Sequence, residues 1–248
     1  MDSPGPPAQP GPSDPYAPYA PSDRLPLALA EELLLLCTDP DSGTLRVSRA
    51  AFQRAVAAAV LAELLLAGAI TAEDRRITAF RPVEARDEVT AEVLALLGRT
   101  VWGRGPGLDR IMRRVPRAPA VRSFRERLVA SGHLTLERRR ILLLVPYRAW
   151  IPVRATVGAE IAERITATLS TTKSAPGYGP GVPGWGAFPA AERDRHLAGL
   201  LWAAMLDRRL FPGRAHAELR KSFRVVAREQ PVAQALRRVV GADNASGG

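Results

Sequence analysis

The chain has 248 residues, of which 46% are hydrophobic, and its formal net charge is +10. This length and composition allow a sizeable buried core, which excludes wholesale disorder. With Cys37 as the single cysteine and three histidines in all, the chain cannot form an internal disulfide framework and lacks the soft ligands of a structural zinc site. We therefore expect no metal and a reducing compartment. The basic surface favours an anionic partner, either nucleic acid or an acidic membrane surface.

The N-terminal residues 1–24 are rich in proline and have almost no aliphatic side chains, which predicts a disordered leader. They have neither the basic start nor the apolar run of a secretory signal, so we expect a cytoplasmic protein. The longest weakly charged stretch, residues 55–70, falls short of the ~20 apolar residues that a spanning helix needs. Any association with a membrane should therefore be peripheral.

The ordered part is predicted to begin with a helix over residues 27–36, ended by the turn-forming residues 39–43. Ser48 is a candidate N-cap for a second helix that continues to Leu66 and ends at Gly68. Residues 69–80 then predict a β-hairpin with a polar tip. Glu31, Glu32 and Glu63 lie on these leucine-rich helices, where capping and ion pairing are more typical roles than acid–base catalysis.

The helix and the hairpin that follows it are repeated further along the chain. A helix is predicted over residues 121–131 and a second hairpin over residues 133–144. A shift of 64 residues superposes Gly68 on Gly132 and Thr71 on Thr135, together with five other identities: Leu64 on Leu128, Glu73 on Glu137, Arg75 on Arg139, Arg76 on Arg140 and Ile77 on Ile141. We infer one helix-to-hairpin unit used twice.

The rest of the chain is predicted to be mostly helical. An apolar segment bracketed by prolines, 146–153, precedes a helix over 156–169, a flexible Gly/Pro loop over 171–188, helices over 189–210, 214–229 and 232–240, and a disordered tail over 241–248. The predicted class is mainly α: a single helical domain, residues 25–240, with short β-hairpins.

Two features of the sequence are candidate binding sites. Residues 179–184 match a dinucleotide-binding fingerprint in letters, but they follow a helix and include two prolines without N–H groups, so we expect no cofactor. Arg122 and Arg125 lie one turn apart on the same helix face, where two guanidinium groups can grip one phosphate. The alternative is a solvated face in which Glu126 pairs with an arginine. No arrangement of residues indicates an enzyme.

Several segments together resemble the Golgi phosphoprotein 3 family over roughly residues 25–240. They are Glu31-Glu32-Leu33 on the first helix, residues 61–68 at the end of the second, and Arg122-Ser123-Phe124-Arg125 followed by Gly132-His133-Leu134-Thr135. The resemblance implies a mostly helical, non-enzymatic, peripheral membrane protein that binds phosphatidylinositol 4-phosphate on the cytosolic face of a membrane. It also implies homo-oligomers and membrane-protein clients as partners.

The resemblance assigns the arginine pair of the family's headgroup site to Arg122 and Arg125. The family's aromatic and third cationic contacts fall on Ser48 and Ala57, which lack the necessary side chains. Arg54, one helical turn from Ala57, is the candidate to replace the missing guanidinium. These departures predict weak discrimination between phosphatidylinositol 4-phosphate and other acidic lipids.

The apolar segment corresponds to a part of the family implicated in oligomerisation and membrane contact. Tyr147, Trp150 and Ile151, beside Arg148 and Arg154, suit a membrane interface. The alternative for them is ordinary packing within the fold.

A nucleic-acid-binding regulator is the alternative function for the whole chain. The helix-to-hairpin unit, with Arg75 and Arg76 at one hairpin and Arg138 to Arg140 at the other, is similar to tandem winged helices whose wings contact phosphate.

Overall fold

The computed structural model describes residues 27–100, 105–141, 145–171 and 189–246. The helices are α1 (Leu29–Cys37), α2 (Arg49–Leu66), α3 (Glu88–Gly98), α4 (Leu108–Arg114), α5 (Arg117–Ala130), α6 (Val157–Thr171), α7 (Ala190–Ala203), α8 (Asp207–Leu210), α9 (Ala217–Glu229) and α10 (Pro231–Ser246). The strands are β1 (Ile70–Glu73), β2 (Arg76–Phe80), β3 (Leu134–Ile141) and β4 (Val145–Pro152), which form two antiparallel hairpins. The predicted mainly α class is confirmed.

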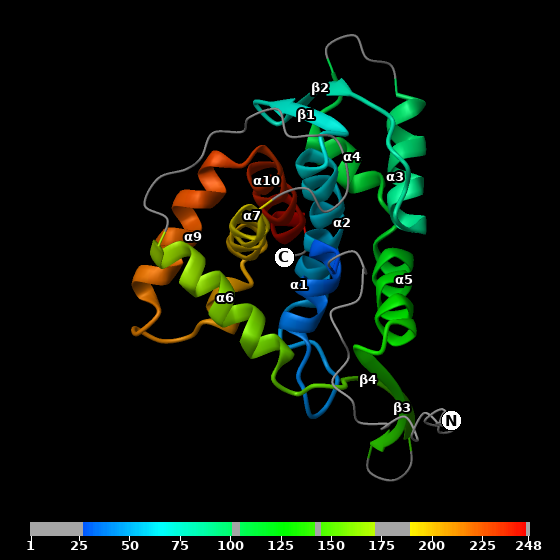
Figure 1. The fold of residues 1–248 in the computed structure, drawn as a ribbon, viewed down its shortest axis with the longest axis vertical. Helices are drawn as coiled ribbons and strands as arrows, with labels where there is room; N and C mark the ends of the chain where they lie inside the picture. Colours follow the sequence, from blue (N-terminus) through cyan, green and yellow to red (C-terminus); the bar gives the residue numbers. More distant parts are fainter. Residues whose placement is uncertain (1–26, 101–104, 142–144, 172–188, 247–248) are drawn as a thin grey trace, which may run out of the picture.

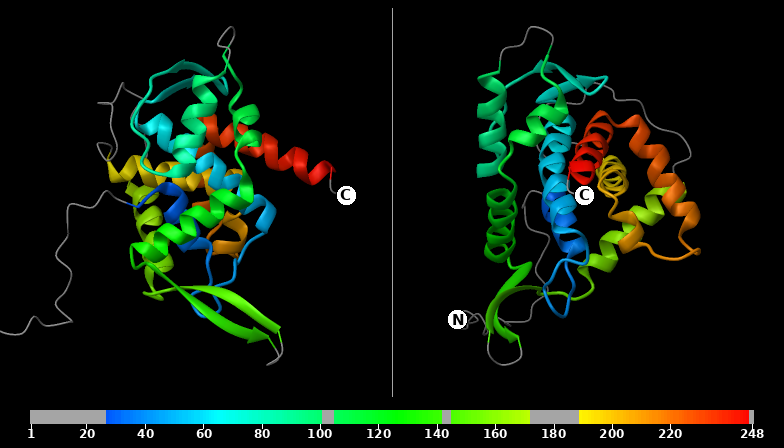
Figure 2. Two further views of the ribbon diagram at one scale, coloured as in Figure 1. Left: turned by 90° about the vertical axis from the view of Figure 1, so that its right-hand side faces the viewer. Right: turned by 180° about the vertical axis from the view of Figure 1, so that it is seen from behind.

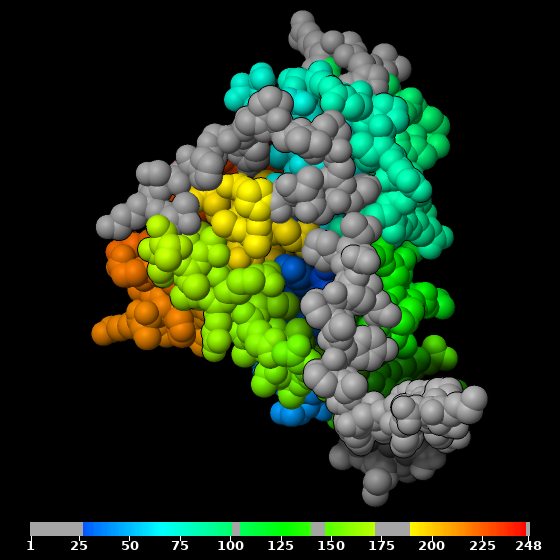
Figure 3. Space-filling view, viewed as in Figure 1, coloured from blue at the N-terminus to red at the C-terminus, as the bar shows by residue number. Residues whose placement is uncertain are grey.

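Helix α2 runs through the middle of the molecule, with α3 and α5 along one edge and α6 and α9 on the other (Figure 1). The two hairpins lie at opposite ends of the long axis. Views from the side and from behind show the same arrangement (Figure 2). On the face shown in Figure 3, α6 and α7 form a continuous surface.

Helices α1 and α2 form the centre of the core because both are apolar around most of their circumference. Every residue of α1 is buried, as is every residue of α2 from Arg54 to Leu64. The alanines of α2 allow close approach by its neighbours, and α1, α5, α7 and α10 all pack against it. A helix that is apolar on all sides is stable only when other elements surround it.

Two carboxylates cap the buried start of α1. Glu31 Oε2 accepts a hydrogen bond from the Ala28 backbone N–H (2.7 Å), and Glu63 Oε1 accepts one from the Leu29 backbone N–H (2.9 Å). These bonds satisfy donors that a helix N-terminus otherwise leaves without partners. Capping, one of the roles expected for these glutamates, therefore occurs at Glu31 and Glu63.

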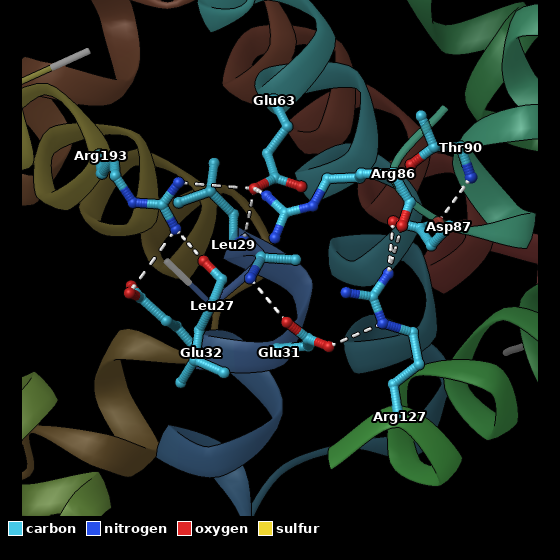
Figure 4. Close-up of polar contacts among 11 residues, drawn as sticks. Leu27, Leu29, Glu31, Glu32, Glu63, Arg86, Asp87, Thr90, Arg127 and Arg193 are labelled. Atoms are coloured by element: carbon cyan, nitrogen blue, oxygen red, sulfur yellow. Dashed lines mark hydrogen bonds and ion pairs between the residues drawn. The ribbon is translucent and has the colours of Figure 1, made fainter. Parts of the chain in front are cut away.

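Five buried carboxylates, these two among them, pair with four arginines from other parts of the chain, and Figure 4 shows the pairs of Arg86, Arg127 and Arg193. The ion pairs are Glu63–Arg86 (3.2 Å), Glu63–Arg193 (3.5 Å), Glu31–Arg127 (3.0 Å), Asp87–Arg127 (2.9 Å), Glu32–Arg164 (2.7 Å), Asp194–Arg164 (2.8 Å) and Glu32–Arg193 (3.6 Å). The carboxylates of these pairs are 6% exposed or less, whereas Arg127 and Arg164 reach the solvent, and we call these residues the buried ionic network. Because a charge removed from water is costly unless it is paired, the network ties the segment around Arg86 and helices α5, α6 and α7 to α1 and α2.

The helix-to-hairpin unit occurs twice, as α2 with β1–β2 and α5 with β3–β4. Both helices end in the same motif, with Gly68 and Gly132 at positive φ (68° and 78°). The next residue in each case donates its N–H five residues back, from Ala69 to Leu64 and from His133 to Leu128. The glycine stop signals read from the sequence are confirmed at both places.

The second hairpin differs from the prediction, because residues 133–144 do not form it alone. The first hairpin turns at Asp74 and Arg75, both at positive φ (44° and 63°). An aspartate tolerates that conformation, whereas the equivalent Arg138 has no such preference. Strand β3 therefore continues to Ile141, and the apolar segment that was expected after the hairpin is its second strand, β4.

The C-terminal third contains two further corrections. The helix expected over 189–210 is broken after Ala203, where Met205 has a φ of 61° and Leu206 N–H bonds to Leu201 O. This is the same C-terminal motif without a glycine, which removed the signal that would have predicted it. The tail expected from Gly241 is helical to Ser246 as part of α10.

Two helices, α3 and α4, were not assigned from the sequence. The leader 1–24 and most of the Gly/Pro loop, 172–188, lie outside the described residues.

Candidate functional site

A pocket of about 680 Å³ lies between the first half of α2, helix α5 and the β3–β4 hairpin. Apolar side chains and arginines line it together: Leu45, Arg49, Phe52, Gln53, Ala118, Pro119, Val121, Arg122, Arg125, Glu126, Val129, Leu136, Arg148 and Trp150. We call it the arginine pocket. Its volume is in the range of pockets that hold small organic ligands.

The two arginines predicted on α5 both line this pocket, but their surroundings differ. Arg122 is exposed, and its Nε donates to Glu126 Oε1 at 2.8 Å, so the expected pairing with Glu126 also occurs. Arg125 is half-buried. Its guanidinium lies 5.7 Å from the Trp150 ring centroid, and its buried Nε has no hydrogen-bond partner within the described part of the chain. Arg125 therefore retains a donor that an anion could satisfy.

Electrostatics favour an anion at the same place. Burial lowers the pKa of Arg125, and repulsion from Arg49 lowers it further. Glu126 is the one acidic side chain among the lining residues, against the arginines at 49, 122, 125 and 148. A phosphate between these guanidinium groups would replace repulsion with charge-assisted hydrogen bonds.

The β3–β4 hairpin contributes the aromatic wall. Trp150 pairs with Leu136 across the hairpin, and Arg148 pairs with Arg138. Because side chains alternate along a strand, Trp150 and Arg148 share one face, and both line the arginine pocket. Trp150 is half-buried and packs against the core.

The other two residues of the predicted membrane segment lie on the opposite face of β4. The Ile151 side chain approaches the tight turn at Gly43, whose φ is 66°, and a Cβ at that glycine would come within 2.8 Å of Ile151 Cδ1. Tyr147 is half-buried and pairs with Arg139 across the hairpin. Trp150 and Ile151 are half-buried and make contacts within the fold, and membrane contact by Tyr147, Trp150 and Ile151 stays a prediction.

Arg54 is not part of the arginine pocket. Its side chain is 6% exposed, and its Nε donates to Asp243 Oδ2 at 2.7 Å. The candidate replacement for the third guanidinium is therefore held elsewhere. Ala57, the position it was expected to replace, is fully buried in the core.

Sequence reasoning did not place three of the pocket-lining residues in the candidate site: Arg49, Arg148 and Trp150. Arg49 directly follows Ser48, the position at which an aromatic contact was sought. Arg148 and Trp150 were singled out, but for membrane contact. Their spacing of two residues was the available signal, since it places both on one face once the segment is recognised as a strand.

The hairpin arginines considered for nucleic-acid contact are partly engaged within the chain. Arg75 Nη1 donates to Gln234 Oε1 (3.4 Å), and Arg76 Nη1 donates to the Gly105 carbonyl (3.0 Å). Arg139 pairs with Glu137 and donates to the Asp41 carbonyl, while Arg138 is exposed. These bonds weaken the similarity to a pair of phosphate-binding wings.

No helix in the described ranges is long and apolar enough to cross a bilayer. Within the same ranges, no group of three or more His, Cys, Asp or Glu side chains is arranged to hold a metal ion.

The arrangement of α2, α5 and the second hairpin around one basic pocket lies within a single stretch that matches a known family. Residues 29–242 match the family described as Golgi phosphoprotein 3. No curated protein is close enough in sequence to count as a match. The matched stretch begins at the first residue of α1, extends into α10 and includes every residue that lines the arginine pocket. The chain therefore belongs to the Golgi phosphoprotein 3 family.

Proposed function

We propose that the arginine pocket binds the phosphorylated headgroup of an acidic phospholipid, and that the protein is a non-enzymatic, peripheral protein of the cytosolic membrane face. The observation that carries this proposal is Arg125. It is a half-buried guanidinium with an unpartnered buried Nε in a pocket where arginines outnumber carboxylates. A lipid phosphate has the charge and the acceptor oxygens that this site lacks.

A phosphoinositide suits the pocket better than a simpler acidic lipid. The Trp150 ring offers a flat face for a sugar-like ring, and Arg49 and Arg148 supply guanidinium groups beyond the α5 pair. These contacts come from positions other than those of the family pattern, but they provide the same chemistry. We therefore propose phosphatidylinositol 4-phosphate as the preferred headgroup, in place of the weak discrimination that Ser48 and Ala57 predicted.

The test is flotation of the full chain with liposomes of phosphatidylcholine containing either phosphatidylinositol 4-phosphate or phosphatidylserine at matched surface charge. Arg122→Ala with Arg125→Ala should weaken binding to the phosphoinositide liposomes by roughly 30-fold or more, because several hydrogen bonds to a charged group are lost. The matched control is Arg208→Ala with Arg209→Ala. These two exposed arginines lie on α8, and their substitution removes the same charge at a place away from the pocket.

Equal losses in the two double variants would mean that net charge alone drives binding, and the pocket assignment would fail. A parallel titration with duplex DNA at near-physiological salt tests the alternative. DNA binding that survives this salt and depends on Arg138 rather than Arg125 would favour a nucleic-acid-binding regulator.

A further inference from the structure

A second group of arginines surrounds the carboxylate of Asp243 near the end of α10. Arg54 of α2 donates through Nε to Oδ2 (2.7 Å) and through Nη2 to Oδ1 (3.4 Å). Arg113 of α4 donates to Oδ1 (3.1 Å), and Arg117 of α5 lies 3.9 Å from Oδ2. Three guanidinium groups from three helices thus converge on one carboxylate.

The donors of this group exceed what one carboxylate can accept. The Arg54 side chain is only 6% exposed, and its Nη1 has no hydrogen-bond partner among the residues described. One negative charge faces three positive charges, so the group keeps an excess of two. A tetrahedral oxyanion has more acceptor oxygens than a carboxylate and, as a dianion, would balance more of the charge.

The carboxylate is attached to a part of the chain that buries little apolar surface. From Gly241 to Ser246 every residue except Asp243 is exposed, and Asp243 is half-buried. The end of α10 also projects beyond the neighbouring helices (Figure 2, left). Since little apolar surface is buried there, the main cost of fraying the last turn is the loss of the Asp243 ion pairs, and a phosphate bound to the three guanidinium groups would replace those pairs.

The position of the group adds a further argument. Arg54 follows Gln53 on α2, and Arg117 precedes Ala118 on α5, and both of those neighbours line the arginine pocket. Arg113 and Arg117 are 40% and 43% exposed. The two arginine groups therefore adjoin one another along α2 and α5, and the second group is open to solvent at Arg113 and Arg117.

We propose that Arg54, Arg113 and Arg117 form a second anion-binding site, which takes a phosphate oxyanion and is occupied in this structure by the Asp243 carboxylate. The carboxylate acts as an internal competitor: an external phosphate binds only the fraction of molecules in which Asp243 has withdrawn. The site is separate from the arginine pocket and does not depend on the headgroup proposal.

Isothermal titration of the full chain with inorganic phosphate, at constant ionic strength, tests the proposal. Asp243→Ala removes the competitor and should strengthen phosphate binding by about tenfold or more relative to the wild type. Glu73→Gln, which removes an exposed carboxylate from the first hairpin, is the charge-matched control and should change the affinity little. Circular dichroism of each variant checks the fold.

Two further backgrounds locate the phosphate. With Arg122→Ala and Arg125→Ala the gain from Asp243→Ala should persist, whereas with Arg113→Gln and Arg117→Gln it should disappear. If the gain is instead lost in the Arg122/Arg125 background, or if Asp243→Ala and Glu73→Gln behave alike, the second site is refuted while the arginine pocket is unaffected.

A further experiment distinguishes a lipid phosphate from a soluble phosphate. The wild type and Asp243→Ala are compared again, now for binding to phosphatidylcholine vesicles that contain a phosphomonoester lipid. A gain with both probes indicates a lipid headgroup. A gain with inorganic phosphate alone indicates a soluble phosphate. Either result supports the site.

Discussion

The buried ionic network and the arginine pocket both contain arginines, but the arginines have different surroundings in the two regions. In the network, Glu63 lies between Arg86 and Arg193, and all three side chains are 7% exposed or less. In the pocket, Arg125 has an aromatic ring beside it and a second arginine, Arg49, near enough to lower its pKa. Arginine is thus a structural cross-link where the fold supplies carboxylates, and we propose that it is a binding group where the fold does not.

The difference lies in the partners rather than in the arginines. A buried charge must be balanced by the fold itself, because leaving it alone costs several kcal/mol. A half-buried charge at a pocket can remain without a carboxylate, since water or a ligand screens it. This comparison predicts that substitutions in the network should change stability, whereas substitutions in the pocket should change binding.

The largest expected effect comes from breaking the network at Glu63. Glu63→Ala leaves Arg86 and Arg193 without this carboxylate and removes the acceptor of the Leu29 N–H, so we expect a loss of about 3–5 kcal/mol in the free energy of unfolding. Urea unfolding at neutral pH measures it. Glu73→Ala on the exposed first hairpin is the control and should change stability little. A loss below about 1 kcal/mol at Glu63 would show that the network does not hold the helices together.

The second prediction concerns His196, which is buried close to Arg193 of the buried ionic network. A proton on His196 would add a positive charge there. Burial, with Arg195 and Arg193 nearby, lowers its pKa to about 4. Between about pH 6.5 and pH 4 the unfolded chain binds a proton at this position that the folded chain does not, so its contribution to stability falls as pH falls. By pH 4.5 we expect a loss of about 2–3 kcal/mol relative to His196→Gln.

The measurement is urea unfolding of both proteins from pH 7 to pH 4.5. The exposed His216→Gln variant is the control and should follow the wild type. Parallel pH profiles for the wild type and His196→Gln would contradict the assignment.

On the pocket side, Trp150 should affect binding more than stability. Trp150→Leu removes the aromatic face beside Arg125 while keeping an apolar side chain, and we expect phosphoinositide binding to weaken by about 0.5–2 kcal/mol. Trp202→Leu is a matched control, because Trp202 is also partly buried and lies outside the pocket lining, with its ring centroid 4.9 Å from the Arg237 guanidinium carbon. Flotation of both variants compares them, and equal losses would assign the effect to packing.

The smallest expected effect comes from Glu126, the acidic side chain in the lining of the arginine pocket. Glu126→Gln releases Arg122 from its ion pair and removes the acidic side chain from the pocket lining, so binding to acidic liposomes should strengthen about two- to fivefold. Glu218→Gln, which releases Lys221 from a similar exposed pair on α9, is the control. Weaker binding by Glu126→Gln would mean that Glu126 positions Arg122 for the headgroup rather than competing with it.

Part of the pocket could be predicted from the sequence, because it depends on spacing within one helix. Residues three apart share a helix face, so Arg122 and Arg125 were expected to point the same way, and both line the pocket. Arg49 and Trp150 could not be placed there, since they come from α2 and β4, far from α5 in the sequence. Arg54 was misplaced for the same reason, because its partner Asp243 is 189 residues away.

The sequence by itself determined the local features: the mainly α class, the two buried helices α1 and α2, and the helix ends at Gly68 and Gly132. These depend on composition, on periodicity and on a glycine at positive φ, all of which are readable over a few neighbouring residues. Only the tertiary structure decided where Met205 ends α7 without a glycine, and which arginines meet a carboxylate. The balance of charge around each guanidinium is set by side chains brought together from distant segments, and no local pattern records it.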